Sequence, residues 1–220
     1  MNIDNFRRAV LIVGLALPIS WTAGSVAAQT ARSYGVKVST PTINQTASSA
    51  VLPLGGDQAQ NSSQSIAIGG LATAQDAFAI ATGDADATDG SNAVSSATLG
   101  VVNLLDGLIT ADGVVAIATS TVGDAAVNSN AEGSSLANLV VGGVEVSDPA
   151  PNTRMDLPGV GYVVLNEQQP SGDGATTSGM TVNMIHVVLQ QPILGVLGRV
   201  TGYQTVGDII VGSATSSVTR

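Results

Sequence analysis

The stretch that decides the fold is PNTRMDLPGVGYVVLNEQ (residues 151–168), followed by MTVNMIHVVL (residues 180–189). Both runs are rich in valine and other residues that favour β-strands. The spacer between them, residues 169–179, contains one proline and three glycines, which break strands and allow the chain to reverse. The pattern predicts a long β-hairpin.

Further strand signals lie on both sides of this hairpin. Short runs of alternating or β-branched residues predict strands at residues 34–40, 101–119, 136–146 and 208–214, the second as two strands or one bulged strand. A Gly142-Gly143 pair predicts a bulge or turn inside the third run. Residues 44–64 and 120–135, rich in Ser, Asn, Gln and Gly, are predicted to be loops. The set predicts an all-β fold, a mostly antiparallel β-sandwich.

The composition restricts how such a fold can be stabilised. The chain contains no cysteine, so disulfides and thiolate metal sites are excluded. Beyond residue 28 only four aromatic residues remain, and the core is therefore expected to consist of Val, Ile, Leu and Ala. Small aliphatic side chains suit thin, tightly paired sheets, and they suit ligand pockets lined by aromatic rings poorly.

The N-terminus has the features of a secretory leader. Arg7 and Arg8 precede an apolar run at residues 9–19, and small residues follow up to Ala28. The run is too short for a membrane anchor and is interrupted by glycine and proline. We expect cleavage near Ala27 or Ala28, which gives a signal helix at residues 1–28 and a single all-β domain at residues 29–220, released or held at the cell surface.

The charge balance argues against nucleic-acid binding. Beyond residue 28 the chain has five basic and fifteen acidic residues, a net charge of −10. Five scattered bases cannot neutralise a phosphate backbone, whereas a net negative charge keeps a protein soluble. The leader aside, no second apolar run is long enough to span a membrane, so no insertion is expected after cleavage.

Residues 65–100 contain an internal repeat with a period of 14 residues, which places Ile66, Ile80 and Val94 in register. The repeat resembles that of trimeric autotransporter adhesin heads, whose rungs stack as a parallel β-roll. Fewer than three rungs are present. A short β-roll is therefore the alternative fold for this segment, and alternating small residues of this kind also form plain antiparallel strands.

Three acids in the repeat, Asp84, Asp86 and Asp89, raise the question of calcium. Their spacing begins like an EF-hand loop. However, Gly90 stands one position late, and Ser95 occupies the position of the closing glutamate. The segment is predicted to be a solvated acidic turn, with weak calcium binding as the alternative.

The lone histidine, His186, falls inside a predicted strand. Counting with a period of two places it on the same face as Val182, Met184 and Val188. No Gly-x-Ser-x-Gly motif accompanies it, and a metal site would lack further imidazoles. A hydrogen-bonded structural histidine is the favoured interpretation.

The remaining polar candidates are Asp106 and Asp112, each followed by glycine, and the cluster Asn166, Glu167 and Gln168. Aspartate before glycine is typical of turns. The cluster is expected to satisfy backbone groups where the hairpin opens. A hydrolase using Asp106, Asp112 and Glu167 would require these carboxylates to line one pocket, and remains the enzymatic alternative.

Five segments taken together resemble the choice-of-anchor P family of secreted bacterial proteins: LLDGLITADGV (104–114), LANLVVGGVEV (136–146), PNTRMDLPGVGYVVLNEQ (151–168), MTVNMIHVVL (180–189) and DIIVGSA (208–214). The resemblance implies export and kinship of fold. The family has no agreed activity, so no catalytic residues are carried over. The chain differs from such proteins in lacking cysteine, and it ends at Arg220 without an anchor segment, which leaves surface retention open.

Leader, composition and resemblance together predict a secreted or cell-surface protein with a structural or interaction role, in adhesion, extracellular matrix or a surface layer. Its partners are expected to be further copies of itself or surface components, bound through exposed edge strands. No cofactor other than weakly bound calcium is expected. The secreted hydrolase and a trimeric adhesin-head module are the alternatives.

Overall fold

The computed structural model describes residues 28–86, 90–123, 126–195 and 198–220, and these form sixteen β-strands. In chain order the strands are β1 Ala28–Ser39, β2 Asn44–Val51, β3 Gln58–Ile68, β4 Ala72–Asp86, β5 Gly90–Leu99, β6 Val102–Leu104, β7 Ile109–Ala111, β8 Gly113–Val122, β9 Val127–Asn130, β10 Ser135–Ala137, β11 Leu139–Val141, β12 Val144–Val146, β13 Thr153–Leu157, β14 Gly161–Ser171, β15 Thr177–Leu194 and β16 Val200–Thr219. Within this part of the chain no helix is long and apolar enough to cross a membrane.

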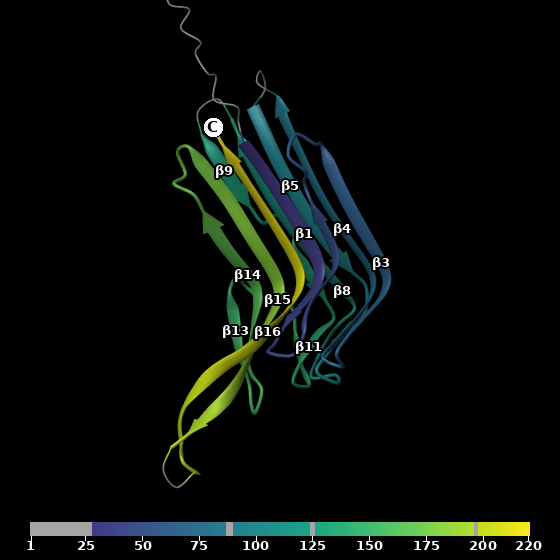
Figure 1. Ribbon diagram of the computed structural model, residues 1–220, viewed down its shortest axis with the longest axis vertical. Coiled ribbons are helices and arrows are strands. Elements are labelled where there is room, and N and C mark those ends of the chain that lie inside the picture. Colours follow the sequence, from purple (N-terminus) through teal and green to yellow (C-terminus); the bar gives the residue numbers. More distant parts are fainter. Residues whose placement is uncertain (1–27, 87–89, 124–125, 196–197) are drawn as a thin grey trace, which may run out of the picture.

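The strands form two antiparallel sheets that face each other (Figure 1). One sheet has six strands in the order β13-β14-β15-β16-β1-β2. The other has ten, with β10-β8-β5-β4-β6-β7-β11-β12 as its main path, β3 beside β4 and β9 beside β8. The prediction of an all-β, mostly antiparallel, sandwich-like fold is confirmed.

The predicted hairpin is formed by β14 and β15, which pair from Gly161↔Leu189 to Ser171↔Gly179. Its turn is closed by Asp173, whose Oδ1 accepts hydrogen bonds from the backbone N–H groups of Ala175, Thr176 and Thr177 at 2.8–3.0 Å. A hydrogen bond from the Thr176 hydroxyl to Oδ2, together with these backbone bonds, holds the pKa of Asp173 well below its usual range. Residues 151–168 also contain a second hairpin, because a turn at residues 158–160 separates β13 from β14.

Two segments predicted to be loops are largely strands. Residues 44–64 contain β2 and most of β3, and residues 120–135 contain β9. β2 and β3 each have one hydrogen-bonded neighbour and pack against each other without pairing. Because the exposed face of an edge strand is solvated, a polar sequence is compatible with pairing there, and tertiary context overrides the local loop signal.

The β-roll alternative for residues 65–100 is wrong. Ile66 pairs with Ala74 on the antiparallel β3–β4 ladder, and Phe78 pairs with Thr98 on the antiparallel β4–β5 ladder. The small-residue alternation therefore belongs to a meander. A period of 14 residues here corresponds to successive antiparallel strands, whose inward positions are filled by alanine.

The core between the sheets has two parts, which differ in the size of the side chains that fill them. One part, at the end of the sandwich where β6 meets β7 and β14 begins, consists of large aliphatic residues, among them Leu104, Ile109, Leu165 and Ile185. The other part, toward the β14–β15 turn, consists mostly of alanine and serine, with Met180, Val182 and Val218 among them. A separate buried cluster there consists of Ala31, Ala50, Ala79, Ala81, Ala93 and Val218.

In the part of the core that is rich in alanine and serine, serine side chains form hydrogen bonds from one sheet to the other. Ser33 Oγ donates to the carbonyl of Ile80 at 2.9 Å, and Ser95 Oγ donates to the carbonyl of Thr215 at 2.9 Å. The hydroxyls of Ser120 and Ser216 lie 2.8 Å apart in the interior. Each pair consists of one residue from either sheet, so these buried polar groups are satisfied by the layer they face.

A transverse elbow divides the two parts, and Figure 1 shows the strands bending at mid-height. In each ladder of the series β14-β15-β16-β1-β2, one residue on either strand is left out of the pairing, and the register is the same on both sides of this gap. For example, Leu165↔Ile185 and Glu167↔Asn183 flank the skipped position on β14 and β15. Positive φ angles occur at the elbow on alternate strands, at Asn166 (49°), Gly212 (63°) and Ser48 (52°).

The elbow changes which side chains point into the core. On β15 the core residues are Val182 and Met184 before the elbow, and Ile185 and Val187 after it. Asn183 and His186 therefore share the outer face although they are three positions apart. The prediction that His186 lies on the face of Val182 and Met184 is wrong, because period-two counting assumes an uninterrupted strand.

Candidate functional site

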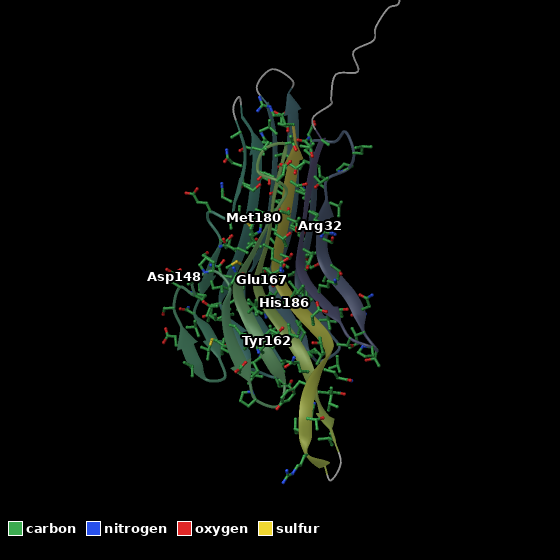
Figure 2. The ribbon with its side chains drawn as sticks, turned by 90° about the vertical axis from the view of Figure 1, so that its left-hand side faces the viewer. Arg32, Asp148, Tyr162, Glu167, Met180 and His186 are labelled. Carbon is green, nitrogen blue, oxygen red and sulfur yellow. The ribbon has the colours of Figure 1, made fainter. Side chains whose placement is uncertain are left out.

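The outer face of the six-stranded sheet carries a row of polar side chains at the elbow. The row runs through hydrogen-bonded neighbours on four strands: Glu167 on β14, Asn183 on β15, Ser213 on β16 and Tyr34 on β1. His186 lies beside the row on β15. Figure 2 shows Glu167 and His186 adjacent on this face.

The side chains of the row form a continuous hydrogen-bonded cluster. Glu167 Oε2 lies 2.9 Å from His186 Nδ1 and accepts a hydrogen bond from Asn183 Nδ2 at 2.7 Å. Gln169 Nε2 donates to Glu167 Oε1 at 2.8 Å. Ser213 Oγ donates to Asn183 Oδ1 at 2.7 Å. The cluster thus connects three adjacent strands at the point where the backbone ladder is interrupted.

Ionisation of Glu167 is favoured by its partners. The hydrogen bond with His186, opposed by burial and assisted by Asn183, lowers the pKa of Glu167 to about 2. On the same row burial raises the pKa of Tyr34, and a hydrogen bond with Ser213 partly offsets that effect. Glu167 is therefore a charged acceptor near neutral pH.

The pairing determines what His186 can do chemically. With Nδ1 donating to the carboxylate, Nε2 is the nitrogen of the neutral ring that carries the lone pair. The ring retains 21% of its side-chain accessibility. Within the described residues, no hydroxyl is hydrogen-bonded to His186 and no group of three His, Asp or Glu side chains could hold a metal ion. The geometry fits a fixed, charged network better than a nucleophile with its base.

The other acids of the hydrolase alternative lie elsewhere. Asp106 (φ 55°) is in the β6–β7 turn, and Asp112 lies between β7 and β8, where it accepts a hydrogen bond from Asn138 Nδ2 at 3.0 Å. Both belong to the ten-stranded sheet, whereas Glu167 belongs to the six-stranded one. Of the three predicted carboxylates, only Glu167 meets His186.

The Asn166 side chain satisfies a backbone group at the elbow, whereas the Gln168 side chain donates to Asn166 Oδ1 at 3.0 Å and the Gln168 backbone is held by Asn152. Asn166 Nδ2 donates to the carbonyl of Pro149 at 3.2 Å, and the backbone N–H of Gln168 donates to Asn152 Oδ1 at 2.9 Å. These contacts hold the chain leading into β13 against β14. Asn166 also adopts the positive φ angle that asparagine tolerates better than most residues.

The calcium candidate lies at the β4–β5 hairpin. Asp84 is exposed on β4 and pairs with Asn92, and β4 ends at Asp86. Asp89 is outside the described residues, and so is the predicted leader at residues 1–27. Calcium binding therefore stays a prediction.

An arm that the sequence did not predict projects from the body; it is defined as residues 190–195 and 198–206, at the end of β15 and the start of β16 (Figure 1). β14 pairs with β15 only as far as Leu189, and β1 pairs with β16 only as far as Asp208. Within the described residues, β15 and β16 pair only with each other beyond these positions, so the outer edges of the arm have no strand partner there. At the base of the arm the Gln190 N–H donates to the Val160 carbonyl at 2.7 Å.

The arm exposes large apolar side chains. Leu194 is 62% exposed and pairs with Val200 at 53%, and Tyr203, opposite Pro192, is 65% exposed. A cleft of about 460 Å³ lies at its base, lined by Pro192, Val200 and Tyr203 of the arm and by the β13–β14 turn. On the β13 side Arg154 covers this cleft and stacks on the ring of Tyr162 at 3.7 Å.

Comparison with known proteins does not distinguish which of these features is functional. The chain matches no family model, no curated protein and no solved structure. Function must therefore be inferred from the elements described above. The sequence did contain a signal for the arm. An apolar run, PILGVL at residues 192–197, begins three residues after the predicted strand 180–189 ends.

Proposed function

We propose that this chain is an exported structural or interaction protein of the cell exterior, and that it makes its contacts through the arm. The arm is the observation that carries the proposal. A two-stranded ribbon with exposed apolar side chains and no third strand is only marginally stable alone in water. Contact with a partner would bury its apolar surface and pair its free edges.

Four further features support an extracellular contact role. The leader-like N-terminus predicts export, and the absence of cysteine makes folding independent of the redox state of the compartment. The resemblance to the choice-of-anchor P family is consistent with a surface location. The antiparallel body has a core built without aromatic side chains, and it holds the arm away from the rest of the molecule (Figure 1).

Cell fractionation tests the location. A C-terminally tagged chain, produced in its native host, is expected in the culture medium or cell envelope, shortened at the N-terminus. The matched control replaces Arg7 and Arg8 with glutamate and leaves residues 28–220 unchanged. That variant is expected to stay inside the cell at full length. Equal distribution of both proteins between the fractions would refute export through the leader.

A further inference from the structure

The chemistry of the arm restricts what it can bind. Residues 190–206 contain one charged side chain, Arg199, which is exposed near the tip. No described residue forms an ion pair with it. The partner surface should therefore be apolar at its centre and acidic around it.

The basic residues of this chain beyond residue 28 all lie outside the ten-stranded sheet. Residues 38–153, which include the entire ten-stranded sheet, contain eleven acidic residues and no lysine, arginine or histidine. The five bases beyond residue 28 all lie outside that range: Arg32, Lys37, Arg154, Arg199 and Arg220. The ten-stranded sheet of one copy thus has the charge that complements the arm of another.

The outer face of the ten-stranded sheet also has an apolar centre. Side chains alternate along β4, β5 and β8, with mainly alanines and serines buried inward. The outward positions form two hydrogen-bonded rows, Phe78-Thr98-Val115 and Ile80-Ser96-Ile117, with Val94 in the next row. We call Phe78, Ile80, Val94, Val115 and Ile117 the outer patch. The five are half-buried or exposed, and none belongs to the core clusters.

Acidic residues lie around the outer patch. Asp84 follows Ile80 and Thr82 on the outward face of β4 and is exposed. Glu132 is exposed on the loop whose Ser134 hydroxyl accepts a hydrogen bond from the Ile117 backbone N–H at 2.9 Å. An apolar centre with a carboxylate rim therefore lies on the face opposite the six-stranded sheet.

We propose that the arm of one copy docks on the outer patch of a second copy. This inference rests on the proposed function and names its partner. The paired part of the arm covers five positions on β15, roughly 16 Å in length, and two strands in width. The outer patch covers three strands, about 10 Å across, over a similar number of residues. Leu194, Val200 and Tyr203 meet apolar side chains there, and Arg199 meets the acidic rim.

Each copy has one arm and one outer patch, on different sheets. Such a contact is heterologous, because the two copies contribute different surfaces, and its repetition gives either a closed ring or an open series of copies. High salt weakens the contact by screening the attraction between Arg199 and the acidic rim.

Sedimentation velocity across a concentration series tests the proposal. Purified protein is expected to shift from monomer to a series of larger species. Leu194→Asp/Val200→Asp in the arm and Ile117→Lys in the outer patch are each expected to weaken association by about tenfold or more. The matched control is Val144→Asp, at an apolar position that is 59% exposed on β12 and outside both surfaces. It should associate like the unsubstituted protein, and circular dichroism confirms that each variant is folded.

A mixing experiment distinguishes docking from other kinds of association. The arm variant retains an intact patch, and the patch variant retains an intact arm. Mixed together they are expected to form a heterodimer and nothing larger, while each remains monomeric alone. Because the chain has no cysteine, Val200→Cys in one partner and Ile117→Cys in the other should form a disulfide under mild oxidation.

Two results would overturn the inference: a purified protein that stays monomeric throughout, or association that survives both the arm and the patch substitutions. Neither affects the proposed function if the chain is still exported and its arm still contacts other components of the cell exterior. If the chain is retained in the cytoplasm but assembles through arm and patch, the proposed function fails and the docking stands.

Discussion

Glu167 illustrates how much one residue depends on the elbow. The carboxylate is fixed by His186, Asn183 and Gln169, and its side chain is 13% exposed. These partners come together because the elbow brings position 186 onto the face of position 183. Glu167 and His186 both stand out in the sequence, yet their contact could not be predicted. Asn183 is the cross-strand partner of Glu167, and uninterrupted alternation along β15 puts positions 183 and 186 on opposite faces.

The lowered pKa of Glu167 predicts a stability change in acid. Its pKa in the folded protein is about 2, below the ordinary 4.5, so its contribution to folding is complete above about pH 4.5 and is lost as the pH falls toward 2. Allowing for solvent screening, we expect the unfolding free energy to fall by about 2 kcal/mol over that range. Glu167→Gln should lack this component of the pH dependence. Urea unfolding at a series of pH values measures both proteins, and parallel curves would contradict the assignment.

Gly212 is the residue of β16 that lies at the elbow. Its φ angle is 63°, and a Cβ there would lie 2.5 Å from Val114 Cγ1 on the facing sheet. Gly212→Ala is therefore expected to destabilise the fold by about 2–4 kcal/mol, through backbone strain and overpacking. The control is Gly202→Ala on the same strand, where the nearest atom is 3.8 Å away. Thermal unfolding that is equal for both variants would show that the elbow tolerates a side chain.

At the scale of elements, the sequence predicted the long hairpin, the first and last strands and the aliphatic core. It missed β2, β3 and β9, because polar edge strands have the composition of loops. It also missed the elbow, which arises from residues in positive φ aligned across several strands. Single-sequence patterns report neighbours along a strand, whereas this feature depends on neighbours across the sheet.

The part of the sandwich that is rich in alanine and serine leads to a prediction about packing. Ala81 on β4 is fully buried in the alanine cluster, where the sheets are also joined by serine hydrogen bonds. Ala81→Leu should cost about 2–3 kcal/mol, because no space exists for the added atoms. Thr82→Leu, the next residue and outward-facing, is expected to change stability by less than about 0.5 kcal/mol. Chemical denaturation of both variants decides whether the sheets can separate to accommodate a larger side chain.

At the scale of the whole molecule, the two sheets differ in charge and in exposed surface. The ten-stranded sheet carries acidic residues without a base, together with the outer patch, whereas the six-stranded sheet carries bases as well as acids and extends into the arm (Figure 1). The net charge was evident from the sequence. That no base lies on the ten-stranded sheet became visible only with the strand order, because β1 and β2 join the C-terminal strands while residues 58–146 form the other layer.

Site-specific photo-cross-linking in intact cells tests most directly whether the arm is the contact element of an exported protein. A photoreactive residue at Leu194 is expected to give a specific adduct outside the cytoplasm, with another copy or with another envelope or matrix component. The same residue at Val51, which is similarly exposed at 61% but lies on β2, should give little or none. Equal adducts from both positions, or none from Leu194 in any fraction, would contradict the account.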